Sequence, residues 1–214
     1  MSIFCYNRAM PTRKGFVPPN DKILRQSAQS IEIGLIKQSE IQGVIDKMFD
    51  IAYGEQSDRS KPILVGLAAP QIGISKRIIL VDVAADGKGH VADLRAYINP
   101  EVTWKSSEEG EWYEGCYSTD CVCGIVSRPV SVKIKAFDRE GNEVHEEYTG
   151  YAARIFQHEI DHLDGKVFVD RVSDDHNLHW VLPEEFPQYR DKEAWRTWPR
   201  KCTREKWRGI VGDL

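Results

Sequence analysis

The sequence predicts an α+β fold in which short antiparallel strands pack around a late central helix, followed by a C-terminal extension. Short strand-like runs separated by turn residues occupy the middle of the chain, and a helical pattern containing H-E-x-x-H comes late, near residue 151. The sequence changes character after residue 172. We therefore divide the 214 residues into an N-terminal arm (1–20), a main domain (21–172) and a tryptophan-containing basic extension (173–214).

Two amphipathic helices are predicted from apolar residues that recur at helical spacing. The first covers Ser39–Tyr53, where Ser39 can cap the start and Gly54 can end the helix. The second runs from about residue 151 to residue 163, after a plausible cap at Thr149 and before the stop signal Asp164-Gly165.

Strands are expected between and beside these helices. The clearest is 130–137, where Val132, Ile134 and Ala136 alternate with polar residues, so that one face is buried and one is wet. A turn over 138–142 then returns the chain as a hairpin. The predicted strands are 77–83, 96–104, 130–137 and 143–148.

Composition and charge exclude several classes of protein. The 29 basic and 33 acidic residues give a net charge of −4, too mild for a wholesale nucleic-acid binder, and no sequence-specific nucleic acid is expected as a partner. No apolar run approaches the roughly 18 residues that a membrane span needs. The five cysteines are an odd number, which favours reduced thiols. We predict a cytoplasmic protein; a basic, acid-poor N-terminus leaves an organelle matrix as the alternative.

The extension holds four of the six tryptophans, and eight basic residues lie between residues 190 and 208. Basic residues interleaved with tryptophan suit RNA or a ribosomal surface. The alternative is that the tryptophans pack on the main domain while the lysines and arginines face water. The four tryptophans are Trp180, Trp195, Trp198 and Trp207.

The strongest chemical signal is the sequence from His158 to His162. Two histidines four residues apart lie one turn apart on one helix face, where both can bind one metal ion. Glu159 is placed to reach a metal-bound water without being a ligand itself. The alternative is a surface helix that carries two histidines by chance.

Two histidines need a third protein ligand, and the residues alone leave it open. Cys116 follows a glycine and carries a thiol that suits a transition metal, but a lone cysteine is more often a small buried apolar residue. His176 and His179 are expected to be solvated loop residues. Cys121 and Cys123 have no zinc-finger spacing relative to Cys116 and are expected to take no part.

A third segment, 65–73, combines small residues with one amide, Gln71, and by itself is only a strand-to-turn connection. In order, the segments 64–71, 114–118 and 158–162 resemble the peptide deformylases, which carry G-x-G-x-A-A-x-Q, E-G-C-x-S and H-E-x-x-H motifs. The resemblance covers roughly residues 21–172. Two positions depart from it: Leu64 replaces the first glycine, and Tyr117 replaces the usual leucine after the cysteine.

The resemblance implies a metallohydrolase of protein biosynthesis that removes the formyl group from formyl-methionyl nascent polypeptides. It implies one divalent metal held by Cys116, His158 and His162, with Fe²⁺ expected first and Zn²⁺, Ni²⁺ or Co²⁺ as alternatives. Metal-bound water would attack the formyl carbon, with Glu159 as general acid and base.

The side-chain amide of Gln71 and the backbone N–H of Tyr117 are implied as oxyanion donors. The formyl-Met peptide would meet backbone groups of Gly66 and Gly115, and the extension would offer a ribosome contact. The expected substrate-binding residues are Val65, Gly66, Gly115, Tyr151 and Ile155.

Two other functions stay open at this point. A zinc peptidase shares H-E-x-x-H, although the ordered second and third motifs argue against it. A binding module of another class would use the extension to grip ribosomal RNA around an inactive core.

Overall fold

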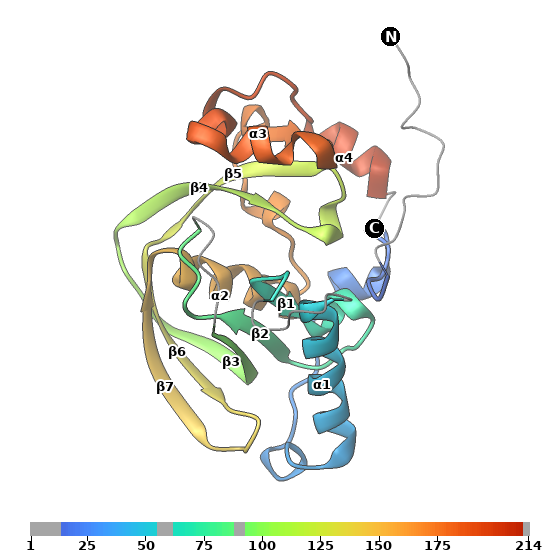
Figure 1. Ribbon diagram of the computed structural model, residues 1–214, viewed down its shortest axis with the longest axis vertical. Coiled ribbons are helices and arrows are strands. Elements are labelled where there is room, and N and C mark those ends of the chain that lie inside the picture. Colours follow the sequence, from blue (N-terminus) through green and yellow to red (C-terminus); the bar gives the residue numbers. More distant parts are fainter. Residues whose placement is uncertain (1–13, 55–61, 88–92, 212–214) are drawn as a thin grey trace.

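The computed structural model describes residues 14–54, 62–87 and 93–211, and it contains two antiparallel sheets with helix α2 (Gly150–Leu163) between them (Figure 1). The larger sheet has the strand order β1-β2-β3-β6-β7 and the smaller one β4-β5-β8. The α+β architecture therefore agrees with the sequence prediction. The strands are β1 (Gly66–Ala68), β2 (Ile78–Asp82), β3 (Leu94–Lys105), β4 (Glu109–Gly115), β5 (Val122–Pro129), β6 (Ser131–Phe137), β7 (Glu143–Thr149) and β8 (Leu178–Trp180).

Strand β2 is buried on both faces, which explains its apolar run from Ile78 to Val81. Ile79 and Val81 pack in the cluster formed with α2, whereas Ile78 and Leu80 pack in the cluster formed with helix α1. Successive side chains of a strand point to opposite faces. The helices α1 and α2 therefore cover opposite faces of this part of the sheet.

Helix α1 (Ser39–Tyr53) has the predicted bounds and buries one face along Ile41, Ile45 and Met48. The prediction that Ser39 caps it is wrong. Gln38 occupies the cap position, without a side-chain hydrogen bond, and Ser39 is already the first helical residue. Gly54 does end the helix, at a φ of 64° that favours glycine.

The hairpin predicted after residue 137 is present as β6 and β7, paired in continuous register from Ser131 opposite Thr149 to Phe137 opposite Glu143. The chain then enters α2 directly. Thr149 holds the cap position of α2 but makes no side-chain capping bond. At the other end, Asp164 is the C-cap and Gly165 follows with a φ of 70°.

The extension continues the smaller sheet. Strand β8 pairs with β5, and the two faces of β5 are covered by different parts of the extension (Figure 1). Helix α3 (Phe186–Arg190) and the 3-10 segment η8 (Asp191–Thr197) cover one face, and helix α4 (Arg204–Val211) covers the other.

Three of the four extension tryptophans are buried, with exposed fractions of 1% for Trp195, 7% for Trp198 and 3% for Trp207. Of the two alternatives for these side chains, packing on the domain is therefore the one observed. The division of the chain into arm, domain and extension at residues 20 and 172 stays a prediction. No helix in the described part of the chain has the length and apolar character needed to cross a membrane.

Candidate metal centre

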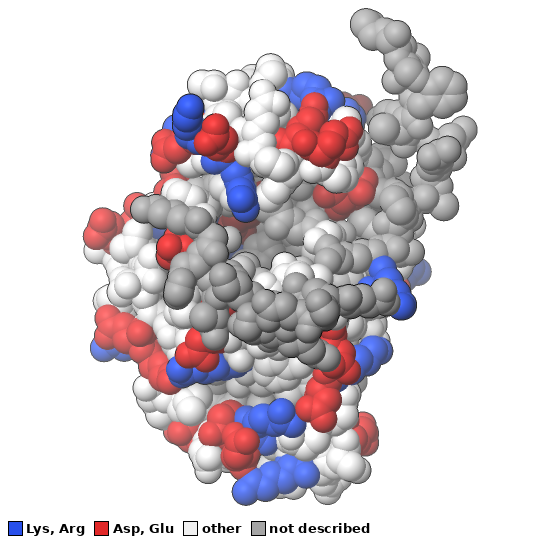
Figure 2. Space-filling model, in the orientation of Figure 1, with Lys and Arg blue, Asp and Glu red and all other residues white. Residues whose placement is uncertain are grey.

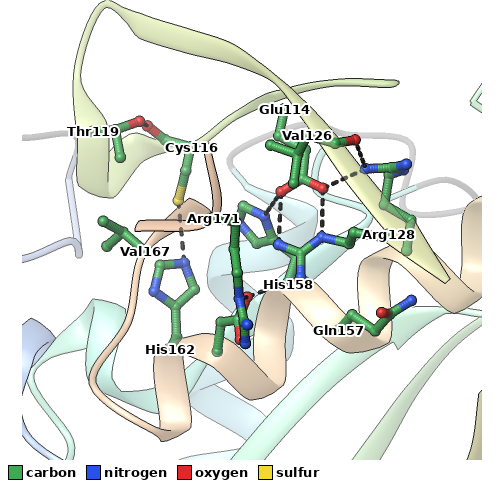
Figure 3. Close-up of polar contacts among 12 residues, drawn as sticks. Glu114, Cys116, Thr119, Val126, Arg128, Gln157, His158, His162, Val167 and Arg171 are labelled. Atoms are coloured by element: carbon green, nitrogen blue, oxygen red, sulfur yellow. Dashed lines mark hydrogen bonds and ion pairs between the residues drawn. The ribbon is translucent and has the colours of Figure 1, made fainter. Parts of the chain in front are cut away.

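Three side chains predicted as metal ligands converge beside α2. The ligand atoms of Cys116, His158 and His162 all lie within 4.8 Å of one another. Cys116 directly follows β4, and its Sγ lies 3.4 Å from Nε2 of His162 (Figure 3). The helix supplies the two imidazoles one turn apart, and the end of β4 brings the thiol to them.

Glu114 orients the first imidazole. Its Oε2 lies 2.9 Å from Nδ1 of His158. A carboxylate only accepts hydrogen bonds, so Nδ1 carries a proton and Nε2 is the nitrogen left for a ligand. This orientation by a carboxylate is typical of metal-binding histidines.

Glu114 belongs to a buried network of charged side chains (Figure 3). It accepts two hydrogen bonds from Arg128, at 2.7 and 2.9 Å, and one from Arg154 at 2.7 Å. Arg128 also reaches Asp161 of α2 at 2.8 Å, and so it ties the end of β4 to the helix. Burial opposes ionisation of Glu114, but the Arg128 guanidinium holds the pKa of that carboxyl well below its usual range.

The thiol sits in an environment that favours its ionised form. Burial raises the pKa of a thiol. The two imidazoles have the larger and opposite effect, that of His162 being first through its charge. Together they hold the pKa of Cys116 well below the ordinary value. Ser118 also donates its backbone N–H to Sγ at 3.4 Å. A thiolate is the form that binds a metal.

Glu159 is buried, with 4% of its surface exposed, and its Oε2 has no hydrogen-bond partner among the described residues. Burial raises the pKa of Glu159 to about 7. Strand β1 approaches it closely at Gly66, where a Cβ would lie 2.4 Å from Glu159 Oε1. Only glycine leaves room for the carboxylate there.

The amide of Gln71 faces the thiol. Its Oε1 accepts the backbone N–H of Ala68 at 2.7 Å, which fixes the orientation of the amide. Its Nε2 therefore points the other way, 3.1 Å from Cys116 Sγ and 3.3 Å from Ser118 Oγ. A donor group thus borders the candidate ligands.

A cavity of about 630 Å³ opens beside this cluster. Tyr117 stands at it with 44% of its surface exposed and its ring 5.1 Å from that of Phe16. His162 lies behind the other two ligands, buried to 1% exposure. The remaining predicted site residues all line the cavity, namely Val65, Gly66, Gln71, Gly115, Cys116, Tyr117, Tyr151, Ile155, His158 and Glu159.

The other candidate ligands do not join the cluster among the described residues. His176 is exposed, as expected of a loop residue. The prediction of a solvated loop residue is wrong for His179, which is fully buried on β8. Its Nδ1 lies 3.0 Å from the Tyr189 hydroxyl, and its Nε2 lies 2.9 Å from Lys201 Nζ. The pairing of β8 with β5 buries it. Cys121 and Cys123 border the cavity without meeting the two imidazoles.

Sequence reasoning missed two groups of residues. The network of Glu114, Arg128 and Asp161 is hard to predict from the sequence. Its charged residues lie in separate segments, and the sequence does not show which of them form ion pairs. The extension residues that line the cavity, Phe186 and Arg190 among them, gave no signal.

Comparison with known proteins places this chain in a family. The sequence model of the family described as polypeptide deformylase matches residues 14–177. A peptide deformylase of Pelotomaculum thermopropionicum is 38% identical over 165 residues, which cover 77% of this chain and 93% of that protein. The peptide deformylase 1A, chloroplastic/mitochondrial, of Arabidopsis thaliana is 34% identical over 169 residues, covering 73% of this chain and 60% of that protein.

The fold agrees with this relationship. The Met-Ala-Ser-bound crystal structure of the class I type b peptide deformylase from Acinetobacter baumannii superposes with a TM-score of 0.65 at 31% identity, covering 73% of this chain and 96% of that one. Most of the extension lies beyond residue 177, outside the match to the family. The chain belongs to the polypeptide deformylase family and is a hydrolase of that family.

Proposed function

We propose that this protein removes the formyl group from the N-terminal methionine of new polypeptides, by hydrolysis of the formyl amide to formate and a free amine. The observation that carries the proposal is the cluster of one thiol and two imidazoles beside a cavity that the buried carboxylate of Glu159 also lines, with no partner for its Oε2 among the described residues. The Met-Ala-Ser bound to the Acinetobacter relative supports a methionyl peptide as the ligand here.

The donor set fits a divalent transition metal. One sulfur and two nitrogens within 4.8 Å of one another suit Fe²⁺, Zn²⁺, Ni²⁺ or Co²⁺, and three protein ligands leave a position open. We favour Fe²⁺, which remains a proposal drawn from the family resemblance. Cys116, His158 and His162 would hold the ion, which when bound supplies Lewis acidity that lowers the pKa of a water molecule.

Glu159 is the proposed proton carrier. Its raised pKa of about 7 allows it to take a proton from the attacking water near neutral pH and to give it to the departing methionine nitrogen. Among the described residues no group donates a hydrogen bond to its buried Oε2, and this supports the role because a water molecule could be that donor.

Two donors are proposed for the oxyanion that forms when the formyl carbon is attacked. The Gln71 amide already points its Nε2 toward the ligand cluster, and Tyr117 would contribute its backbone N–H. A donor of this kind contributes about 3 kcal/mol to the transition state.

The peptide would bind between the two sheets. Strand β1 is an edge of the larger sheet and β4 is an edge of the smaller one, so an extended peptide can add to them at Gly66 and Gly115. Val65, Tyr151 and Ile155 line the same cavity and would hold the methionine side chain.

We also propose a binding partner, the ribosome, and a cytoplasmic location for the protein. Lysines and arginines are interspersed with acidic residues on the face drawn in Figure 2. Because three tryptophans of the extension are buried, we propose that a ribosome contact would use exposed basic side chains and not aromatic stacking. The free thiols of Cys116, Cys123 and Cys202 are compatible with the proposed cytoplasmic location.

The decisive assay is formate release from formyl-Met-Ala-amide by protein purified without oxygen. We expect one formate and one new amine per turnover, with no cleavage of the Met-Ala bond. Acetyl-Met-Ala-amide is the matched control and should turn over far more slowly. Release of formyl-methionine and alanine amide without formate would instead identify a peptidase and overturn the proposal.

A further inference from the structure

The extension supplies one wall of the cavity that holds the proposed active site. Five of its residues line that cavity together with Gly115, Cys116 and Glu159; they are Val181, Leu182, Pro183, Phe186 and Arg190. All five lie beyond residue 177, where the match to the family ends. This wall is therefore built from residues outside the match to the family model.

The wall is firmly anchored. The ring of Phe186 packs edge-on against Tyr113 of β4, with 5.9 Å between centroids, and lies 3.7 Å from the position of a Cβ on Gly115. Tyr189, in the same helix, is fully buried against Tyr113 and Trp198. Helix α3 is thereby fixed over the end of β4, where the peptide is proposed to bind.

Arg190 ends α3 and places a positive charge at this wall. Its side chain is exposed and lines the cavity, as those of Tyr113 and Tyr151 do. In the described part of the chain no carboxylate forms an ion pair with Arg190. By contrast, Arg196 pairs with Glu193 and Glu111.

Of the two arginines among the described residues that line the cavity, Arg190 is the one available to a ligand. Arg154 is committed to Glu114 and to two backbone carbonyls. Asp120 lines the cavity on the loop that follows Cys116. An anionic group on a ligand would be repelled by that loop and attracted to the wall formed by α3.

We propose that Arg190 binds a carboxylate on the part of the peptide that follows the formyl-methionine, and so makes the enzyme favour anionic peptides. The carboxylate has two sources, an acidic side chain or the free C-terminus of a short peptide. The inference rests on the proposed deformylase function and adds a determinant of substrate choice to it.

Two matched peptide pairs separate the sources. Formyl-Met-Ala-Asp-amide against formyl-Met-Ala-Asn-amide tests a side-chain carboxylate, and formyl-Met-Ala-Ala against its amide tests the C-terminus. For at least one pair we expect kcat/KM to favour the charged member by about two- to fivefold, as for an exposed ion pair. The preference should act through KM and shrink at high salt.

Variants of the full-length protein assign the preference to Arg190. In Arg190→Gln the charged-to-neutral ratio should fall to about one, and in Arg190→Glu it should invert. Arg196→Gln, which removes a nearby arginine that does not line the cavity, should retain the wild-type ratio.

The results with the four peptides distinguish a failure of the role proposed for Arg190 from a failure of the proposed deformylase function. Equal kcat/KM for both members of each pair in the wild type, or a preference that survives Arg190→Gln, would overturn this inference while leaving the proposed function in place. Absence of formate release from all four peptides would overturn the proposed function and this inference with it.

Discussion

The candidate metal centre and the core of the extension are each built around a histidine, which is the half-buried His158 at the centre and the fully buried His179 in the extension. At the centre, Nδ1 of His158 is engaged by Glu114 and its other nitrogen is left for a ligand. In the extension both nitrogens of His179 are engaged: Lys201 can only donate to Nε2, so Nδ1 carries the proton and donates to the Tyr189 hydroxyl.

This difference is the one we expect between a metal-binding site and a structural core. At the centre, Oε2 of Glu159 and Nδ1 of His162 have no hydrogen-bond partner among the described residues. The extension core satisfies His179 completely and packs aromatic rings around it. Substitutions at the centre should therefore change metal content and rate, whereas substitutions in the extension core should change stability.

The largest effect is expected at the thiol. Cys116→Ala should lower the metal content far below one ion per chain and abolish formate release, because two imidazoles alone hold a divalent ion poorly. Cys123→Ala is the matched control, since Cys123 is buried nearby but is not part of the ligand cluster. Metal analysis of both proteins checks this, and equal metal retention would remove Cys116 from the ligand set.

A second substitution tests the centre without touching a ligand. In Gly66→Ala the new methyl group would collide with Glu159 Oε1 at 2.4 Å, so the carboxylate must move and the rate should fall by at least about tenfold. Gly43→Ala, in α1, meets nothing within 4 Å and should leave the rate unchanged. A Gly66→Ala enzyme with full activity would show that the position of Glu159 is not critical.

In the extension the expected effect is on folding. Trp195→Ala should lower the free energy of unfolding by about 3–5 kcal/mol, the usual cost of truncating a buried tryptophan, because Trp195 packs on Trp112 and Tyr113. Trp104, 46% exposed on β3, provides the control. Denaturant unfolding checks both variants. Similar losses for the two would mean that the extension core contributes little to stability.

The smallest effect concerns pH. Burial, and then Lys201, lowers the pKa of His179 to about 4, whereas an unfolded histidine titrates near 6.5. Between these values the unfolded chain binds the extra proton, so stability should fall as the pH drops from 6.5 toward 4, by on the order of 1 kcal/mol. His179→Asn should flatten this dependence and His176→Asn should not. Equal pH slopes in all three proteins would contradict the assignment.

The part that the sequence predicts well is local in the chain. The helix with its two histidines and the β6–β7 hairpin depend on spacings within one segment, and periodicity reveals such spacings. Cys116 needed the order of three motifs, since nothing in its own neighbourhood distinguishes a ligand from a buried thiol.

The rest depends on pairing between distant segments. The burial of His179 follows from β8 joining β5, and a three-residue strand carries too little pattern to predict. The bond from Arg128 to both Glu114 and Asp161 spans three elements. Ser39 was expected to cap α1, but the helix begins at that residue because Gln38 takes the extended cap conformation.

We propose that Glu159 moves the proton while Cys116, His158 and His162 hold the metal. Glu159→Gln keeps the shape of the side chain and removes the base, so one preparation should show full metal content, retained peptide binding and a rate lowered by about 10²–10⁴-fold. A rate within a few fold of the wild type would contradict the role of Glu159, and loss of the metal would show that its role is structural.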